Sequence, residues 1–529
     1  MASALFSEAQ RLIETGRFAA AARAARTLLA ENPQLTEAWM LLALAEQRQQ
    51  RFDAMLAALR VAARLQPMNT AVLLKLCEAR LYCGLGDEAR AGLAALERGA
   101  QHEPRLLTSI ANLYMTAGAQ EDRLRCALRA LALAPTEQRS LANVAAAETA
   151  CGLIAEAERH LDELLVRYPT DHGAYYRRST LRRQSPERNH VREIRARLAA
   201  LPVDSADIVP LCFALAKEHE DLGDFLQAGA FLQRGAARRR QKLSYDVASD
   251  ERALQTIIGN FSAERLSAAH RGGGRGAAAI FVMGLPRSGT TLVDRIVSSH
   301  SAVQSLGEIN DLAYAIIGAV HAGSAVDAAP PDRLELIKHA AQLDYPTLGD
   351  DYLRRVDGYA RTRPRFIDKT PWNFLYLGLI AQALPGARII HVRRDPMDSC
   401  FALYKTLFRD GSPYSYDLND LARYYLGYHQ LMEHWRRALP GRFLEIDYEH
   451  VVQSQEPATR ELLAWCDLPF EAQCLEFHRN TAPAATASAA QVREPVHTRS
   501  VGNWKNYAAL LEPLAAALRA GGLAIDSGG

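Results

Sequence analysis

The feature that most restricts the fold of this chain is a 34-residue period in its N-terminal third. Prolines, glycines and small residues each recur at this interval. The prolines are Pro33, Pro67, Pro135 and Pro169, with Pro104 close to the empty position at Gln101. The glycines are Gly16, Gly84, Gly118 and Gly152, with Gln50 at the gap, and the small residues are Ala9, Ala43, Cys77, Ala111 and Ala145. Three sets that share one period predict a repeated structural unit.

The residue types in these sets predict pairs of antiparallel helices. A small residue lets two helices approach closely, glycine ends the first helix, and proline breaks the second. The spacing resembles the tetratricopeptide repeat, with about five units over residues 1–175, and residues 214–225 begin a further helix pair. Residues 177–197 are strongly basic, which is typical of a solvated helix face and turn. Residues 1–245 are therefore predicted to form an all-α solenoid, whose partner would be a protein or peptide ligand.

The pattern changes in the C-terminal half, so the chain is predicted to be multidomain. From residue 277, short apolar runs alternate with helical segments, which predicts an α/β domain with a mainly parallel sheet over residues 246–529. The strands are expected at residues 278–283, 365–367, 387–392 and 442–446, and the glycine-rich run 272–276 is expected to be a loop before the first. Ligands bind beyond the carboxyl ends of such strands, where this chain places polar clusters.

The clearest cluster follows the first strand, in the stretch AIFVMGLPRSGTTL of residues 279–292. It resembles a phosphate-binding loop in which Thr290 stands at the lysine position. Backbone N–H groups and the start of a helix would hold an oxyanion, and Arg287 adds a fork of donors suited to phosphate or sulfate. The predicted anion-binding residues are Gly284, Pro286, Arg287, Ser288, Gly289, Thr290 and Thr291.

A second cluster follows the strand at residues 387–392, which ends in Arg393 and Arg394. A nucleoside triphosphatase would place an acidic residue there to hold magnesium. The arginines indicate a second anion and no metal, although Asp395 and Asp398 keep a metal open. Lys369 follows another strand, and residues 493–507 are basic and aromatic.

Five motifs in this order carry a family resemblance: PRSGTT, GE, DKTP, HVRRDP and SVGNWKNY. Over residues 250–515 the chain resembles sulfotransferases that use 3'-phosphoadenosine 5'-phosphosulfate (PAPS), and it is most similar to the tyrosylprotein branch and its repeat-carrying bacterial relatives. The resemblance implies a P-loop-like domain, transfer of a sulfuryl group with release of adenosine 3',5'-bisphosphate, and no catalytic metal.

The resemblance also implies roles for single residues. Arg287 would lie near the transferred group, Glu308 would be the general base, and Lys369 would stabilise the bridging oxygen as the sulfuryl leaves. Arg394 would bind the 3'-phosphate. Residues 499–505 would close over the nucleotide, which adds Arg499, Trp504 and Lys505 to the predicted cofactor-binding residues.

One position departs from the family pattern, and two histidines compete for the role of base. The family places a serine eight residues after the 3'-phosphate arginine, where this chain has Ala402, so Ser399 or Lys405 would supply the contact. His300 lies where a helix is expected to end, which favours capping. His391 lies in an apolar strand, which favours a satisfied core residue.

The sequence leaves the acceptor open. A protein or peptide tyrosine is preferred, with a carbohydrate or small-molecule hydroxyl as the alternative; a nucleotide-dependent kinase and a nucleotide-binding interaction protein without turnover remain possible. The net charge of +2 argues against bulk nucleic-acid binding. Eight cysteines without a C-x-x-C pair, and no apolar segment long enough to span a membrane, predict a cytoplasmic protein.

Overall fold

The computed structural model describes residues 2–268, 274–323, 330–409, 411–484, 486 and 489–525. These residues form two compact units. Unit 1 consists of the described residues within Met1–Ala134, Ile309–Thr362 and Gln382–Leu384. Unit 2 consists of those within Pro135–Glu308, Arg363–Ala381 and Pro385–Gly529. The sequence predicts a boundary at residue 245 between two domains that fold separately. The division into compact units does not test separate folding, so this boundary stays a prediction.

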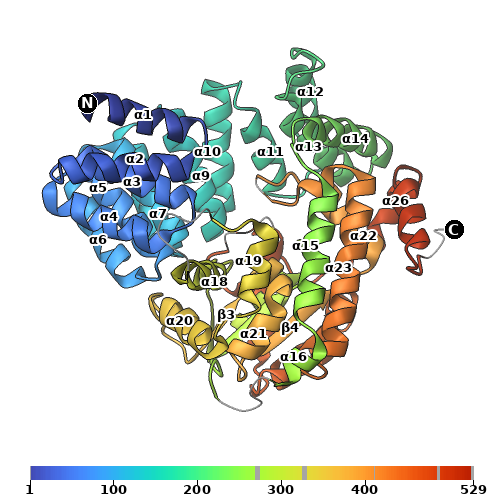
Figure 1. Ribbon diagram of the computed structural model, residues 1–529. Helices are drawn as coiled ribbons and strands as arrows, with labels where there is room; N and C mark the ends of the chain where they lie inside the picture. Colours follow the sequence, from blue (N-terminus) through green and yellow to red (C-terminus); the bar gives the residue numbers. More distant parts are fainter. Residues whose placement is uncertain are drawn as a thin grey trace. The chain divides into compact units, whose positions relative to one another are not determined.

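Unit 1 begins with antiparallel helix pairs (Figure 1). The helices are α1 (Ala2–Glu14), α2 (Phe18–Glu31), α3 (Thr36–Arg48), α4 (Phe52–Leu65), α5 (Thr70–Tyr82), α6 (Gly86–Gly99), α7 (Pro104–Thr116) and α8 (Gln120–Leu133). Every second helix starts 34 residues after the one before it, at residues 18, 52, 86 and 120. The predicted helical-repeat array is therefore confirmed.

The three periodic sets have the structural roles that the sequence predicts. Each set glycine has a left-handed backbone between paired helices, with φ from 71° to 82°, and Gln50 holds the same conformation at φ 60°. Each set proline lies in the turn after a second helix. All five small residues are buried, with at most 3% of their surface exposed. The period therefore marks turns and helix contacts.

Unit 1 also contains three helices from the middle of the chain: α18 (Asp311–Ala322), α19 (Arg333–Ala340) and α20 (Tyr345–Asp357). The Tyr314 ring packs edge-on against Phe52 and Tyr82, with ring centroids 5.3 and 5.2 Å away. Arg355 donates a hydrogen bond to the Tyr82 carbonyl at 2.7 Å. These helices thus extend the core of the repeat stack.

Unit 2 begins with the later helices of the array. They are α9 (Gln138–Cys151), α10 (Ile154–Arg167), α11 (His172–Thr180), α12 (Val191–Ala199), α13 (Ile208–Asp221) and α14 (Phe225–Gln241). Helices α13 and α14 are the further pair that the sequence predicts. The basic segment is only partly a solvated face, because Arg178 is 4% exposed and its guanidinium pairs with Asp162 and Glu193.

The rest of unit 2 is built on a five-stranded parallel sheet in the order β2-β3-β1-β4-β5. The strands are β1 (Ala279–Met283), β2 (Val303–Ser305), β3 (Arg365–Asp368), β4 (Arg388–Arg393) and β5 (Leu444–Asp447). The four predicted strands are confirmed, and β2 is an additional edge strand. Of the predicted glycine-rich loop, residues 272 and 273 lie outside the described residues, and residues 275–276 form a turn.

Helices cover both faces of this sheet. Ile280, Ile390 and Ile446 face an apolar core shared with helices α17 and α25. On the other face, helices α15 and α23 lie side by side (Figure 1), and Tyr428 on α23 bonds His391 of β4. The helices of this part are α15 (Val247–Asn260), α16 (Ala263–Ala268), α17 (Thr290–Ser298), α21 (Leu377–Ala383), α22 (Pro396–Tyr404), α23 (Leu418–Ala438), α24 (Tyr448–Gln453), α25 (Gln455–Trp465) and α26 (Ala508–Ala520). Short 3-10 helices are η1 (Pro371–Tyr376), η2 (Pro413–Tyr416), η3 (Ala472–Cys474), η4 (Phe477–Arg479), η5 (Gln491–Arg493) and η6 (Asn503–Tyr507).

None of the helices in the described part of the chain is both long enough and apolar enough to cross a membrane. The eight cysteines all lie in the described part of the chain, none of them is in a disulfide there, and seven are buried.

Candidate functional site

The loop after β1 is a tight turn that requires glycine at both ends. A Cβ atom on Gly284 would lie 2.5 Å from the Val392 carbonyl oxygen, and one on Gly289 would lie 2.5 Å from a ring carbon of Tyr448. Gly289 has φ 108°, a backbone conformation that favours glycine. Helix α17 begins at the next residue, so its first N–H groups open into the turn. Pro286, Ser288, Thr290 and Thr291 are all buried.

Arg287 is the strained residue of this loop. Its backbone is left-handed, with φ 70°, which costs an ordinary residue roughly 1–2 kcal/mol. The half-buried side chain donates a hydrogen bond to Gln491 Oε1 at 3.1 Å. Burial lowers the pKa of its guanidinium, and the nearby Arg394 lowers it further. A positive charge is thus held at the loop against an electrostatic cost.

Arg394 joins the loop to the late segment of the chain. Its guanidinium donates to the Arg287 carbonyl oxygen at 3.1 Å and to the Ser500 carbonyl oxygen. It also lies over the Tyr448 ring, 4.7 Å from the centroid. Its Nε is buried and has no hydrogen-bond partner among the residues described. Arg393 differs, because it pairs with Asp447 through two 2.9 Å hydrogen bonds.

The acidic residues after β4 serve as backbone caps. Asp395 accepts the N–H of Asp398 at 2.9 Å at the start of α22. Asp398 in turn accepts the N–H groups of Gly502 and Trp504. Within the described residues there is no group of histidine, cysteine or acidic side chains that could hold a metal ion.

Lys369 and Glu308 form an ion pair beyond the ends of β3 and β2. The Lys369 side chain is 1% exposed and that of Glu308 is 37% exposed, so the ammonium is buried and the carboxylate reaches solvent. Two hydrogen bonds fix the turn between them. Lys369 N–H donates to the Gly307 carbonyl at 2.9 Å, and Gly307 N–H donates to Ser305 Oγ at 3.1 Å.

Asp294 is a buried carboxyl group that the sequence did not mark. It lies on α17, it is 5% exposed, and burial raises its pKa while the Lys369 charge lowers it. A hydrogen bond from Ser305 links it to the turn that carries Glu308. In the sequence Asp294 is a carboxylate among apolar residues on the helix after the anion loop, and this pattern does not separate a buried carboxyl group from a solvated one.

The side chains of the late segment, residues 499–507, differ in their burial and in their partners. Arg499 donates to Glu494 at 2.7 Å, and Trp504 is buried. The Lys505 side chain is exposed. Tyr507 packs on the Phe401 ring at 4.4 Å between centroids.

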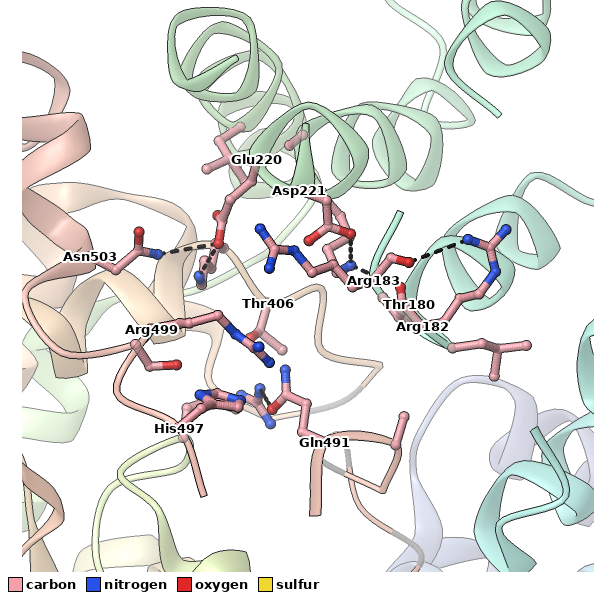
Figure 2. A pocket seen from close by; sticks show the side chains of 18 of the residues that line it. Thr180, Arg182, Arg183, Glu220, Asp221, Thr406, Gln491, His497, Arg499 and Asn503 are labelled. Carbon is pink, nitrogen blue, oxygen red and sulfur yellow. Dashed lines mark hydrogen bonds and ion pairs between the residues drawn. The ribbon is translucent and has the colours of Figure 1, made fainter. Parts of the chain in front are cut away.

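Two of the cavities in the described part of the chain are lined by residues of this loop. They have no predicted site residue in common. The first, of about 440 Å³, is lined by Arg287, Arg499 and Ser500 together with side chains of the last repeats, including Tyr176 and Arg183 (Figure 2). The second, of about 410 Å³, is lined by Ser288, Arg394 and Ser399 among others. Consecutive loop residues thus face different cavities. Gly284, Pro286, Gly289, Thr290, Thr291, Glu308, Lys369, Trp504 and Lys505 are not among the lining side chains.

The two candidates for the contact missing at Ala402 lie in different places. Ser399 lines the same cavity as Arg394 and donates to its carbonyl oxygen at 3.4 Å. Lys405 lines the first cavity and pairs with Glu220 at 2.7 Å. Ser399 therefore lies in the same cavity as the predicted 3'-phosphate arginine.

The two histidines have structural partners. His391 contacts Glu445 at 2.8 Å and the Tyr428 hydroxyl at 2.6 Å, and burial lowers its pKa. His300 is buried, accepts the N–H of Ala302 at 3.0 Å, and contacts the Pro469 carbonyl oxygen at 3.1 Å. Neither histidine lies at the Glu308–Lys369 pair.

Comparisons with known proteins were made for the whole chain. Residues 279–472 match the model of the "Sulfotransferase family". A protein of Aquifex aeolicus (strain VF5), described as "Uncharacterized protein", is 31% identical over 312 residues, which is 58% of this chain and 41% of that protein's length. A "Putative protein-tyrosine sulfotransferase" of Caenorhabditis briggsae is 24% identical over 238 residues, which is 42% of this chain and 80% of that protein.

Two solved structures match parts of the chain. A tetratricopeptide repeat protein from Parabacteroides merdae ATCC 43184 covers 46% of this chain and 94% of its own, with 15% identity and a TM-score of 0.33. The sulfotransferase domain from the curacin biosynthetic pathway covers 45% and 96%, with 16% identity and a TM-score of 0.31. Residues 279–472, in the C-terminal half, thus match a sulfotransferase-family model, and they follow an array of helical repeats.

Proposed function

We propose that the chain transfers a sulfuryl group from PAPS to an acceptor hydroxyl. The observation that carries this proposal is that three features lie at the carboxyl ends of neighbouring strands. Arg287 is held in a left-handed turn, Arg394 bonds that turn to the late segment, and a buried lysine pairs with a carboxylate beyond the adjacent strand β3. Each lies at the carboxyl end of a parallel strand, where ligands bind in open α/β sheets.

The residues present fit a donor with two anionic ends. The buried Ser288 Oγ has no hydrogen-bond partner among the described residues, and neither has Arg394 Nε, so each is available to an anion. Val392 and Tyr448 approach Gly284 and Gly289 so closely that a side chain would not fit at either position. The N–H groups of Gly284 and Ser288 bond the carbonyls of Pro371 and Leu285, so the donors offered to an anion in this proposal are the other N–H groups of the loop. In this proposal residues 284–291 hold the 5'-phosphosulfate, and Arg394 with Ser399 holds the 3'-phosphate. Arg499, Trp504 and Lys505 belong to the segment that covers the nucleotide.

When bound, PAPS supplies the sulfuryl group and a phosphate leaving group. Glu308 accepts the proton of the acceptor hydroxyl through its solvent-reaching carboxylate. Lys369 and Arg287 place positive charge where negative charge develops on the leaving oxygen and the transferred group. Asp294 bonds Ser305 and so fixes the turn from which Glu308 projects.

The proposed acceptor is a tyrosine of a protein or peptide. The similarity to the protein named as a protein-tyrosine sulfotransferase supports this choice, and so do the helical repeats, because stacked repeats commonly bind peptides. The first cavity adds support, because the repeats and the domain that carries Arg287 both line it. We place the reaction in the cytoplasm, in keeping with eight free thiols.

The test is transfer from PAPS labelled with ³⁵S, using the full chain and peptides with and without tyrosine. The expected result is label on the tyrosine peptide and none on its phenylalanine counterpart. Label on a carbohydrate or small phenol alone would contradict the peptide acceptor. Transfer from γ-labelled ATP with magnesium, but not from PAPS, would indicate a kinase. Thermal stabilisation by adenosine 3',5'-bisphosphate without transfer to any acceptor would indicate a binding protein.

A further inference from the structure

Glu220, on the last helix pair of the repeats, is bonded to the transferase half of the chain on three sides. Its carboxylate accepts hydrogen bonds from Lys405 Nζ at 2.7 Å, Asn503 Nδ2 at 3.2 Å and the Tyr507 hydroxyl at 3.1 Å. Figure 2 shows Glu220 projecting from its helix, with a dashed line to Asn503. All of these residues belong to unit 2.

The neighbouring carboxylate Glu218 has a different set of partners. It is fully buried and bonds Ser179 at 2.7 Å and His190 at 2.9 Å, both of which belong to the repeat helices and their turns. The side chain of Glu218 therefore holds the repeats together. The partners of Glu220 follow α22 or lie in η6, outside the repeats.

The segment that Glu220 holds is connected to the anion loop through Arg394. Arg394 donates to the Ser500 carbonyl on one side and to the Arg287 carbonyl on the other. Asp398 fixes the same segment through the N–H groups of Gly502 and Trp504. A displacement of residues 500–507 would therefore alter the environment of Arg394 and, through it, the loop.

The electrostatic balance at Glu220 favours such a role. Burial opposes ionisation of its carboxyl, but Lys405 and the hydrogen bonds together lower its pKa. The Glu220 side chain is 20% exposed, and a partly buried carboxylate with several charge-assisted hydrogen bonds is strongly oriented. The side chain is thus suited to hold one position of the segment.

We propose that Glu220 is a positioning residue through which the helical repeats hold residues 499–507 against the donor-binding loop. The proposal rests on the proposed function, because the segment is taken to cover the donor nucleotide. It makes the last repeats part of the transfer site, in addition to any role in binding a partner. The side chains of the last repeats that line the first cavity then have a role in transfer as well as in the fold.

The test compares donor kinetics in the full chain carrying Glu220→Gln. The amide keeps the size of the side chain but loses its charge, so the bonds to Lys405, Asn503 and Tyr507 weaken. We expect the donor KM and the Kd for adenosine 3',5'-bisphosphate to rise about tenfold, the equivalent of one hydrogen bond to a charged group. The kcat at saturating donor should change less than KM. Asn503→Ala, which alters the same contact from the segment side, should change KM in the same direction.

The matched control is Glu218→Gln, on the same helix. It should lower thermal stability and leave the donor KM unchanged. Coupling supplies a second readout: Glu220→Gln and Tyr507→Phe should be non-additive in donor affinity, because one weakens and the other removes the same hydrogen bond.

Two outcomes separate this inference from the proposed function. If the wild-type chain transfers sulfuryl groups and Glu220→Gln has an unchanged donor KM and nucleotide affinity, the positioning role is wrong and the proposed function stands. Additive effects of the Glu220 and Tyr507 changes would overturn it in the same way. If the wild-type chain neither transfers nor binds the nucleotide, the proposed function fails, and this inference fails with it.

Discussion

The Lys369–Glu308 pair should respond unequally to loss of either partner, because its members are buried to different degrees. The ammonium is 1% exposed and the carboxylate 37%. Replacing a whole buried ion pair with apolar side chains is neutral or stabilising by roughly 1–4 kcal/mol, and loss of one partner is costly only where the charge that remains is buried. Lys369→Met leaves the Glu308 carboxylate, which reaches solvent. We therefore expect Lys369→Met to keep or raise the free energy of unfolding. Asp294 limits the gain, because it loses a neighbouring positive charge, although burial already raises its pKa and favours its neutral form.

Glu308→Gln should have the opposite effect on stability. It leaves the buried ammonium beside a neutral amide, and loss of one partner of a buried pair costs roughly 3–5 kcal/mol. The exposure of Glu308 and the nearby Asp294 carboxyl place the expected cost at or below the lower end of that range. Both variants should lose transfer activity. The expected loss in kcat is about 10²–10³-fold for Lys369→Met and about 10²–10⁴-fold for Glu308→Gln.

The assay follows thermal unfolding with and without adenosine 3',5'-bisphosphate and compares the midpoint of the transition that this nucleotide shifts. Transfer from labelled PAPS is measured in parallel. Glu308→Asp is the control, because it keeps the charge near Lys369 while moving the carboxylate. It should retain most of the stability and lose activity. A Lys369→Met chain that unfolds as easily as the Glu308→Gln chain would refute the reasoning about unequal burial. If either variant transferred sulfuryl groups at the wild-type rate, the residue that it replaces would have no role in the proposed reaction.

Three further changes test other parts of the structure. Gln50→Gly should raise the free energy of unfolding of unit 1 by about 1 kcal/mol, measured by denaturant titration, because an exposed non-glycine residue holds φ 60° there; an unchanged or lower value would contradict this. Gly289→Ala should weaken binding of adenosine 3',5'-bisphosphate at least tenfold in calorimetry, because its Cβ would lie 2.5 Å from the Tyr448 ring; wild-type affinity would show that the loop is not the binding site. Glu445→Gln should flatten the loss of stability in acid. Burial opposes ionisation of Glu445, but hydrogen bonds to a histidine and an arginine lower its pKa from 4.5 to about 2. The ionised carboxylate therefore stabilises the fold by roughly 3 kcal/mol above pH 4.5, and this contribution disappears as the pH falls toward 2. An unchanged loss of stability in acid would contradict this.

The repeats could be predicted because their constraints are local. A left-handed turn residue and a small residue at a helix contact recur at a fixed spacing, so the period is visible in the sequence. Strand β2 was missed because it has only three residues, of which only Val303 is fully buried. The packing of α18–α20 on the repeats could not be predicted, since Tyr314 and Arg355 find their partners more than 200 residues away in the sequence.

The candidate site divides in the same way. The loop at residues 284–291 could be located because its glycines, arginine and threonines are contiguous and follow an apolar strand. Asp294 and Glu220 were not found, because a carboxylate on a helix has no local mark that separates a solvated residue from a buried one. Their roles depend on Ser305 and on residues 503–507, which only the folded chain brings near.

The path of the chain between the two units has a practical consequence. The chain passes from unit 2 to unit 1 at the peptide bond after Glu308 and returns before Arg363. Deleting the first repeats would leave α18–α20 without the apolar surface that Tyr314 packs against. Deleting residues 309–362 would join the proposed base to Arg363, two residues before β3. Neither the first repeats nor residues 309–362 can therefore be removed without changing the surroundings of the part that remains. Assays on an isolated C-terminal fragment would therefore measure a chain in which the surroundings of Glu308 are altered, and an inactive fragment would not test the activity proposed for the full chain.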